Sequence, residues 1–144
     1  MILTDVNVVV YAHRREAPDH ERYRRWLERL VSSDEAYGIS DRVLSGFARI
    51  VTHARIFSPP TPLDVALAEV EQLRIRPNAV VLAPGSRHWS IFTDLCRRGR
   101  ATGNLAADAY HAALAIETGS EWVTSDGDFA RFPGLRWRHP FETA

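Results

Sequence analysis

The chain has 144 residues, a length that suits one compact domain spanning residues 1–144. Its formal net charge of zero excludes a bulk electrostatic attraction to nucleic acid or anionic lipid. Cys96 is the only cysteine, which excludes an intramolecular disulfide and a zinc site built on thiolates, and the absence of lysine excludes every mechanism that needs one. The sequence shows no secretory leader and no apolar run long enough to span a membrane, so we expect a cytoplasmic protein with no membrane partner.

Short apolar runs alternate with stretches of helical periodicity, a pattern typical of an α/β domain. Strands are predicted at residues 2–4, 36–39, 79–83, 121–124 and 135–138, the last of them at a sheet edge. Helices are predicted at residues 19–33, 41–53, 62–75, 86–98 and 105–118, with start signals at Ser40 or Asp41, at Thr61 and at Ser86. Residues 7–13 fit either a strand, which their valines favour, or a short helix. We therefore expect a parallel sheet of about five short strands sandwiched between helices.

The predicted helix at residues 19–33 combines an apolar face with a dense run of charge. Tyr23 and Trp26 lie on its apolar face. The charged residues among them are Arg22, Arg24, Arg25 and Arg29, with Glu21 and Glu28. We interpret this run as a solvated face with pairing between residues four apart.

Carboxylates follow three of the predicted strands. Asp5 ends the first strand within an almost wholly apolar stretch, where an unpaired charge is costly. Asp41 follows the second strand, and Asp126 and Asp128 follow the fourth. Asp108 lies one turn into the helix that precedes the fourth strand. Because ligands of an open parallel sheet bind beyond the carboxyl ends of its strands, these side chains can face one crevice.

Several carboxylates in one crevice stay ionised together only when a cation neutralises them, and their oxygen atoms suit Mg²⁺ or Mn²⁺. Such a site supports metal-assisted phosphoryl chemistry. The same residues also have structural interpretations. Asp5 could cap a helix that begins near Asn7, and Asp126 with Asp128 could form an Asx turn. Asp41 is most simply a helix cap or a first-turn acid.

Three stretches resemble the motifs of a known family. Residues 4–12 (TDVNVVVYA) resemble the opening of a PIN domain, residues 108–115 (DAYHAALA) its third acidic motif, and residues 124–129 (TSDGDF) its fourth. With the ending at residues 132–137, the resemblance covers essentially the whole chain. It is closest to the VapC-type ribonuclease toxins of bacterial toxin–antitoxin pairs.

The resemblance implies a single PIN-like α/β domain that acts as a metal-dependent endoribonuclease on structured RNA such as tRNA or rRNA. The implied cofactor is Mg²⁺, for which Mn²⁺ can substitute, and the implied partners are a cognate antitoxin and a second copy of the chain. The implied catalytic metal ligands are Asp5, Asp108 and Asp126, and Asp128 is a further candidate ligand. Asn7 and Ser125 are the residues expected to orient these ligands.

The chain departs from the family at the second acidic motif, where the family usually carries a glutamate and Gly46 stands here. Either Asp41 supplies the missing charge or the site works with fewer ligands. The alternative function is a catalytically impaired PIN-like module that binds antitoxin or RNA without cleaving it. His111, one turn after Asp108, is expected to be a packing or surface residue.

Because the net charge is zero, contacts to RNA must be local. The candidate phosphate contacts are Arg14, Arg15, Arg97, Arg98 and Arg100, and a solvated or salt-bridged surface is the alternative for each. A response-regulator receiver is disfavoured because the chain has no lysine. A dehalogenase-type phosphatase is disfavoured because it needs an aspartate where Asn7 stands.

Overall fold

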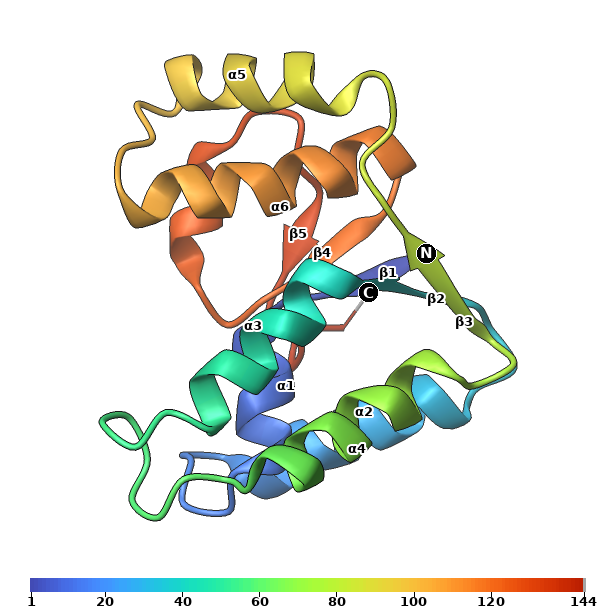
Figure 1. Ribbon diagram of the computed structural model, residues 1–144. Helices are drawn as coiled ribbons and strands as arrows, with labels where there is room; N and C mark the ends of the chain where they lie inside the picture. Colours follow the sequence, from blue (N-terminus) through green and yellow to red (C-terminus); the bar gives the residue numbers. More distant parts are fainter. Residues whose placement is uncertain (144) are drawn as a thin grey trace.

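A sheet of five parallel strands organises the computed structural model, which describes residues 1–143 (Figure 1). The strands, in the spatial order β3-β2-β1-β4-β5, are β1 (Ile2–Thr4), β2 (Tyr37–Ser40), β3 (Ala79–Leu82), β4 (Glu121–Val123) and β5 (Trp137–Arg138). The helices are α1 (Val6–His13), α2 (His20–Ser32), α3 (Asp41–Val51), α4 (Leu63–Arg74), α5 (His88–Arg98) and α6 (Asn104–Thr118), followed by a 3-10 helix, η1 (Gly127–Arg131). The predicted α/β architecture and the edge position of the last strand are confirmed.

The helices are distributed on both sides of the sheet. Figure 1 shows α5 and α6 packed together on the opposite side of the sheet from α2 and α4. Helix α1 contacts both α2 and α3. No helix within residues 1–143 is long and apolar enough to cross a membrane.

Strand β1 lies at the centre of the sheet, between β2 and β4. The Asp5 amide extends the β1–β4 pairing by donating to the Val123 carbonyl at 2.9 Å. The chain proceeds from β1 to β2 on one side, and β4 lies on the other side. The strand order therefore reverses next to the carboxyl end of β1, which is where open parallel sheets place their ligands.

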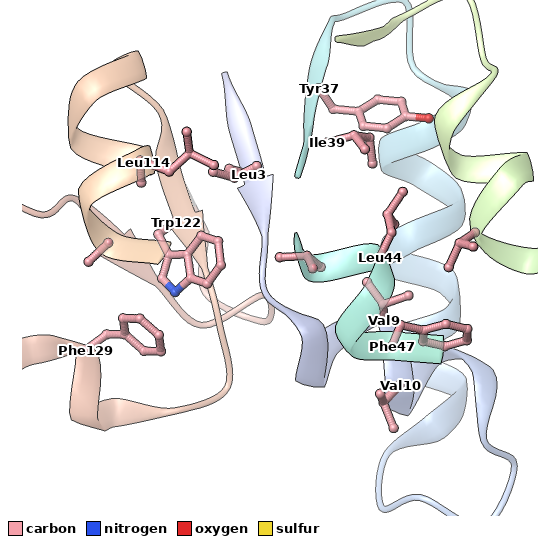
Figure 2. Packing of buried hydrophobic residues seen from close by; sticks show 14 of the residues in the cluster. Leu3, Val9, Val10, Tyr37, Ile39, Leu44, Phe47, Leu114, Trp122 and Phe129 are labelled. Atoms are coloured by element: carbon pink, nitrogen blue, oxygen red, sulfur yellow. The ribbon is translucent and has the colours of Figure 1, made fainter. Parts of the chain in front are cut away.

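The core fixes these elements against one another (Figure 2). Leu3 of β1, Phe47 of α3 and Trp122 of β4 are fully buried within one apolar cluster. Four alanines of α6 are also fully buried, and their small side chains allow α6 to lie close to the sheet. They are Ala109, Ala112, Ala113 and Ala115.

Residues 6–13 form helix α1, which settles the ambiguity of this segment. The Asp5 carboxylate caps the helix by accepting a hydrogen bond from the Val6 amide at 2.6 Å. Val8, Val9 and Val10 are buried against neighbouring elements, and this tertiary packing overrides the intrinsic strand preference of valine.

Two predicted helix starts are wrong. Helix α4 begins at Leu63, and the Thr61 hydroxyl contacts the side chains of His13 and Arg14 instead of capping the helix. Helix α5 begins at His88 without a side-chain cap, so Ser86 does not cap it. At α3 the alternatives are resolved, because Ser40 is the N-cap and Asp41 is the first helical residue.

Candidate metal centre

Asp5 is a buried carboxylate at the centre of the sheet edge. Its side chain is held by three neutral donors: the Val6 amide at 2.6 Å, the Thr124 hydroxyl at 2.7 Å and the Asn7 amide group at 3.3 Å. The residue is only 4% exposed. Burial raises the pKa of Asp5 to about 6, against the hydrogen bonds from Thr124 and Val6, and the charges of Asp108 and Asp126 raise it further. Asp5 therefore both caps helix α1 and ends strand β1, so its structural role does not remove it from the candidate site.

Asp108 on α6 and Asp126 after β4 approach Asp5 closely enough to affect its charge. Burial raises the pKa of the half-buried Asp108 carboxyl to about 6, and repulsion by Asp126 and Asp128 adds to this, while Arg131 opposes it. Asp126 also makes the Asx turn, since its side chain accepts the Asp128 amide at 2.9 Å. The structure thus places Asp108 and Asp126 within electrostatic reach of Asp5, and the exposed Asp128 within reach of Asp108.

Thr124 is the residue of this centre that sequence reasoning missed. Its hydroxyl donates to Asp5 at 2.7 Å and accepts from the Asp126 amide at 3.0 Å and from the Asn7 side chain at 3.3 Å. Thr124 is fully buried at the end of β4. One hydroxyl therefore links the chain at two of the candidate ligands. A hydroxyl residue two places before Asp126, at a strand end, was the available signal.

Asn7 and Ser125 lie where the sequence predicted residues that orient the ligands. The Asn7 side chain donates to Asp5, and its oxygen accepts the Ser125 amide at 3.4 Å. These contacts connect the start of α1 with the segment after β4. Their role in orienting ligands stays a prediction.

The donor set fits an oxygen-preferring divalent cation. The hydrogen bonds to Asp5 come from neutral groups only, so its charge is not compensated by a cationic side chain within residues 1–143. Neighbouring carboxylates raise the pKa values of both Asp5 and Asp108, and a cation between them would reverse this effect. In residues 1–143, however, no three Asp, Glu, His or Cys side chains are already gathered at the distances that hold a metal ion.

Asp41 is not part of this group. Its carboxylate is exposed and forms a two-pronged ion pair with Arg74 of α4, at 2.8 and 3.2 Å. The Arg74 guanidinium lowers the pKa of Asp41, the opposite of the effect at Asp5 and Asp108. Gly46 lies on α3 near the start of α1, where an added Cβ would meet Val6 Cγ2 at 3.5 Å, an ordinary contact distance. The position therefore has room for a Cβ atom.

His111 is a packing residue, as expected. Its ring stacks on the Trp122 indole with centroids 5.3 Å apart. Burial lowers the pKa of His111 to about 4, and the Arg42 charge contributes in the same direction. The imidazole is therefore neutral at physiological pH.

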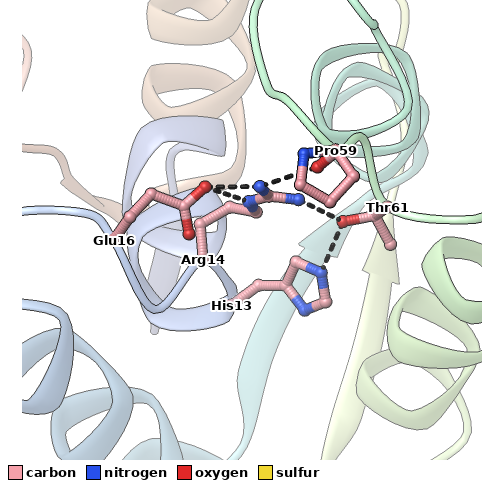
Figure 3. A network of polar contacts seen from close by, with 5 residues as sticks. All are labelled: His13, Arg14, Glu16, Pro59 and Thr61. Atoms are coloured by element: carbon pink, nitrogen blue, oxygen red, sulfur yellow. Dashed lines mark hydrogen bonds and ion pairs between the residues drawn. The ribbon is translucent and has the colours of Figure 1, made fainter.

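The predicted RNA-contacting arginines differ in how free they are. Arg14 is held in a network with Glu16, Thr61 and the Pro59 carbonyl, and its side chain is only 11% exposed (Figure 3). Arg98 pairs with Asp94 at 3.4 Å. The other candidates are not in ion pairs within residues 1–143, namely Arg15, Arg97 and Arg100.

Arg15 lines a groove of about 460 Å³ that lies among α1, α2, α3 and α4. None of the candidate aspartates lines this groove. The hollow is thus separate from the acidic centre, and its size does not identify it as the site of chemistry.

The PIN domain family model matches residues 2–135 of the chain. The chain therefore belongs to the PIN-domain family. Among its relatives, ribonuclease VapC43 of Mycobacterium tuberculosis is 47% identical over 142 residues, covering 99% of this chain and 97% of the relative. Ribonuclease VapC25 of the same organism is 38% identical over 140 residues, covering 97% of this chain and 99% of the relative. These relatives place the chain, within that family, among the VapC ribonucleases.

Solved structures agree at the level of fold. VapBC2 of Rickettsia felis, bound to a promoter DNA fragment, superposes with a TM-score of 0.69 at 23% identity, covering 96% of this chain and 98% of that chain. VapC20 of Mycobacterium tuberculosis, a toxin that cleaves the sarcin–ricin loop, superposes with a TM-score of 0.66 at 17% identity, covering 94% of this chain and 99% of that chain.

Proposed function

We propose that the chain is a Mg²⁺-dependent endoribonuclease, with Mn²⁺ able to substitute, and the toxin of a toxin–antitoxin pair. The single observation that carries the metal dependence is the buried Asp5 carboxylate at the point where the strand order reverses, which is hydrogen-bonded by neutral donors only and has no cationic partner within residues 1–143. Membership of the VapC ribonucleases supports RNA hydrolysis. Structured RNA, either tRNA or rRNA, is the proposed substrate.

The residues of the centre have distinct tasks. Asp5, Asp108 and Asp126 would hold the cation, with Asp128 available as an additional carboxylate. A bound divalent cation supplies a water of lowered pKa and stabilises negative charge on the phosphate oxygens. Thr124 fixes the Asp5 carboxylate and the Asp126 backbone relative to each other. Little reorganisation of these two residues would therefore be needed when a cation binds.

The proposed partners are a cognate antitoxin and a second copy of the chain. Structural neighbours that are VapBC complexes support the antitoxin. RNA as the substrate places the proposed action in the cytoplasm. We favour cleavage over the binding-only alternative, because Asp5, Asp108 and Asp126 are all present and only Gly46 departs from the family pattern.

The test is cleavage of purified tRNA and rRNA by the protein with Mg²⁺, with Mn²⁺ and with EDTA, beside the Asp5→Asn variant. We expect discrete cuts that require both the metal and Asp5, because the amide cannot supply the charge that the cation needs. The variant retains a capping oxygen for the Val6 amide, so circular dichroism should show that it stays folded. Undiminished cleavage by Asp5→Asn would contradict the proposal.

A further inference from the structure

A second hollow lies between the outer face of α2 and the end of the chain. It has a volume of about 500 Å³ and is lined by Arg22, Arg25, Arg29, Arg138 and Phe141, among others. We call it the arginine groove. Four of the chain's 18 basic residues therefore line one hollow of a protein whose net charge is zero.

Three of these arginines are free to bind a ligand. Arg22, Arg25 and Arg29 are exposed, and none forms an ion pair within residues 1–143. The two acids of the same helix, Glu21 and Glu28, are both engaged by Arg24. The helix is therefore only partly the self-paired surface that its sequence suggests.

The fourth arginine and the one acid of the groove hold its wall. Arg138 pairs with Glu121 at 2.9 Å and donates to the Glu142 carbonyl at 3.0 Å. The Glu142 carboxylate accepts a long hydrogen bond from the His139 amide, at 3.4 Å. Within residues 1–143, the groove is thus lined by one carboxylate, that of Glu142, and by three arginines that form no ion pair, which leaves this lining positive.

The three free arginines present a regular row of donors. Positions 22, 25 and 29 lie on one helix face, separated by about 4.5 Å and about 6 Å along the axis. Arg22 stacks over the Phe141 ring, with 3.9 Å from its guanidinium carbon to the ring centroid. Guanidinium groups bind phosphate oxygens through a planar fork of donors, so such a row suits a chain of phosphates.

The arginine groove is joined to the acidic centre through Tyr23. The Tyr23 ring packs on Phe141 with centroids 4.6 Å apart, and its hydroxyl lies beside His139. Tyr23 also belongs to one buried apolar cluster with Val123, the last residue of β4. Val123 lies three residues before Asp126, and the groove therefore flanks the segment that carries a candidate ligand.

The acidic centre repels the phosphates of a nucleic acid until a cation is bound, so attraction must come from another surface. We propose that the arginine groove binds the phosphodiester backbone of the RNA substrate, with Arg22, Arg25 and Arg29 each contacting phosphate. This inference rests on the proposed ribonuclease function. It assigns substrate binding to α2 and leaves hydrolysis to the carboxylates.

The test compares two triple variants, each lacking three positive charges. One is Arg22→Gln/Arg25→Gln/Arg29→Gln. The matched control is Arg74→Gln/Arg87→Gln/Arg136→Gln, whose guanidinium groups are already held by the Asp41 carboxylate and by the carbonyls of Glu117 and Gly119. Affinity for fluorescein-labelled bulk tRNA is measured by anisotropy in EDTA between about 50 and 200 mM salt, and cleavage of the same tRNA is measured with Mg²⁺.

We expect the groove variant to bind tRNA about 10- to 100-fold more weakly at about 0.1 M salt, with a log–log salt slope smaller by about 2, since each phosphate contact contributes about 0.7 to 0.9. The control should keep the wild-type slope. Wild-type affinity and slope in the groove variant, with wild-type protein cleaving normally, would overturn the groove alone. Wild-type protein that neither binds nor cleaves RNA would overturn both proposals. Polyglutamate serves as a probe for an acidic protein partner. If the groove variant loses binding of polyglutamate but keeps wild-type affinity for tRNA, the RNA proposal is overturned and the groove is assigned to such a partner.

Discussion

The carboxyl ends of β1 and β2 are adjacent in the sheet, and each is followed directly by an aspartate and a helix. After β1, Asp5 is buried, is held by neutral donors and has a raised pKa. After β2, Asp41 is exposed, is paired with Arg74 and has a lowered pKa. An aspartate that follows a strand is therefore left without a cationic partner at one strand end and is paired with an arginine at the other.

This contrast shows that position at a strand end does not by itself make a ligand. The two aspartates differ in the groups that the tertiary structure places next to their carboxylates. Asp5 is buried, accepts a hydrogen bond from Thr124 and is repelled by two other carboxylates, whereas Asp41 is paired with an arginine from α4. Only the first arrangement has negative charge that a cation would relieve.

The largest difference is expected when the two regions are disabled in turn. Asp108→Asn should reduce metal-dependent RNA cleavage by about 10³-fold or more. The change removes a proposed ligand of the cation, and a bound cation stabilises the charged transition state by several kcal/mol. Asp41→Asn should leave the rate within about 2-fold, since only an exposed ion pair is lost. Initial rates on one RNA under saturating Mg²⁺ provide the comparison. Equal losses in the two variants would remove the distinction between the regions.

The pH dependence of stability should also separate the two strand ends. Because the pKa of Asp5 is raised to about 6 from an ordinary 3.8, the folded, metal-free protein holds this proton more tightly than the unfolded chain. The stability from Asp5 is fully present below about pH 4 and is lost as the pH rises through 6, by up to about 3 kcal/mol. Asp108 acts in the same direction but less, because water screens its half-exposed charge.

His111 opposes this trend over the same range, because its lowered pKa makes the protein lose stability as the pH falls from about 6.5 to about 4. Urea unfolding in EDTA at pH 4, 5, 6 and 7.5 should therefore be read as the difference between wild type and Asp5→Asn. The variant should gain stability relative to wild type as the pH rises. A pH-independent difference would mean that Asp5 is not held at a raised pKa.

The Thr124 hydroxyl, which links Asp5 after β1 with Asp126 after β4, can be removed with little change in side-chain shape. Thr124→Val should reduce cleavage by about 10- to 100-fold, because Asp5 loses a donor and the Asp126 amide loses its acceptor. Thr124→Ser retains the hydroxyl and should restore most of the activity. A serine variant as impaired as the valine variant would point to packing of the methyl group instead.

Much of the fold was predictable because it depends on local pattern. The five strands and five longer helices follow from apolar periodicity and turn signals, and the burial of Tyr23 and Trp26 follows from the same periodicity. Helix α1 was not decided by the sequence, because the preference of consecutive valines for strands is reversed only by tertiary burial.

The candidate ligands Asp5, Asp108 and Asp126 could be named from the sequence, because strand topology and family motifs each point to individual positions in the chain. Partners distant in sequence could not be anticipated. Arg74 lies 33 residues from Asp41, and Thr124 lies 119 residues from Asp5. The free charges of α2 were equally hidden, because the helix contains enough acids to pair several of its arginines and the structure gives both acids to Arg24.

The smallest effect is expected on α3, the helix that follows β2. Gly46→Ala should stabilise the protein by up to about 1 kcal/mol, because the helix interior gains propensity and the new Cβ meets Val6 only at ordinary contact distance. Urea unfolding at pH 7.5 measures this, and cleavage should be unchanged. Destabilisation by Gly46→Ala would show that the packing around residue 46 does not tolerate a Cβ atom.

The central claim is that the carboxylates around Asp5, and not the aspartate after β2, bind the divalent cation. Isothermal titration of Mn²⁺ into wild type, Asp5→Asn and Asp41→Asn tests it without any RNA. The account predicts binding to wild type and to Asp41→Asn, and loss of binding in Asp5→Asn. Equal Mn²⁺ binding by wild type and Asp5→Asn would contradict it.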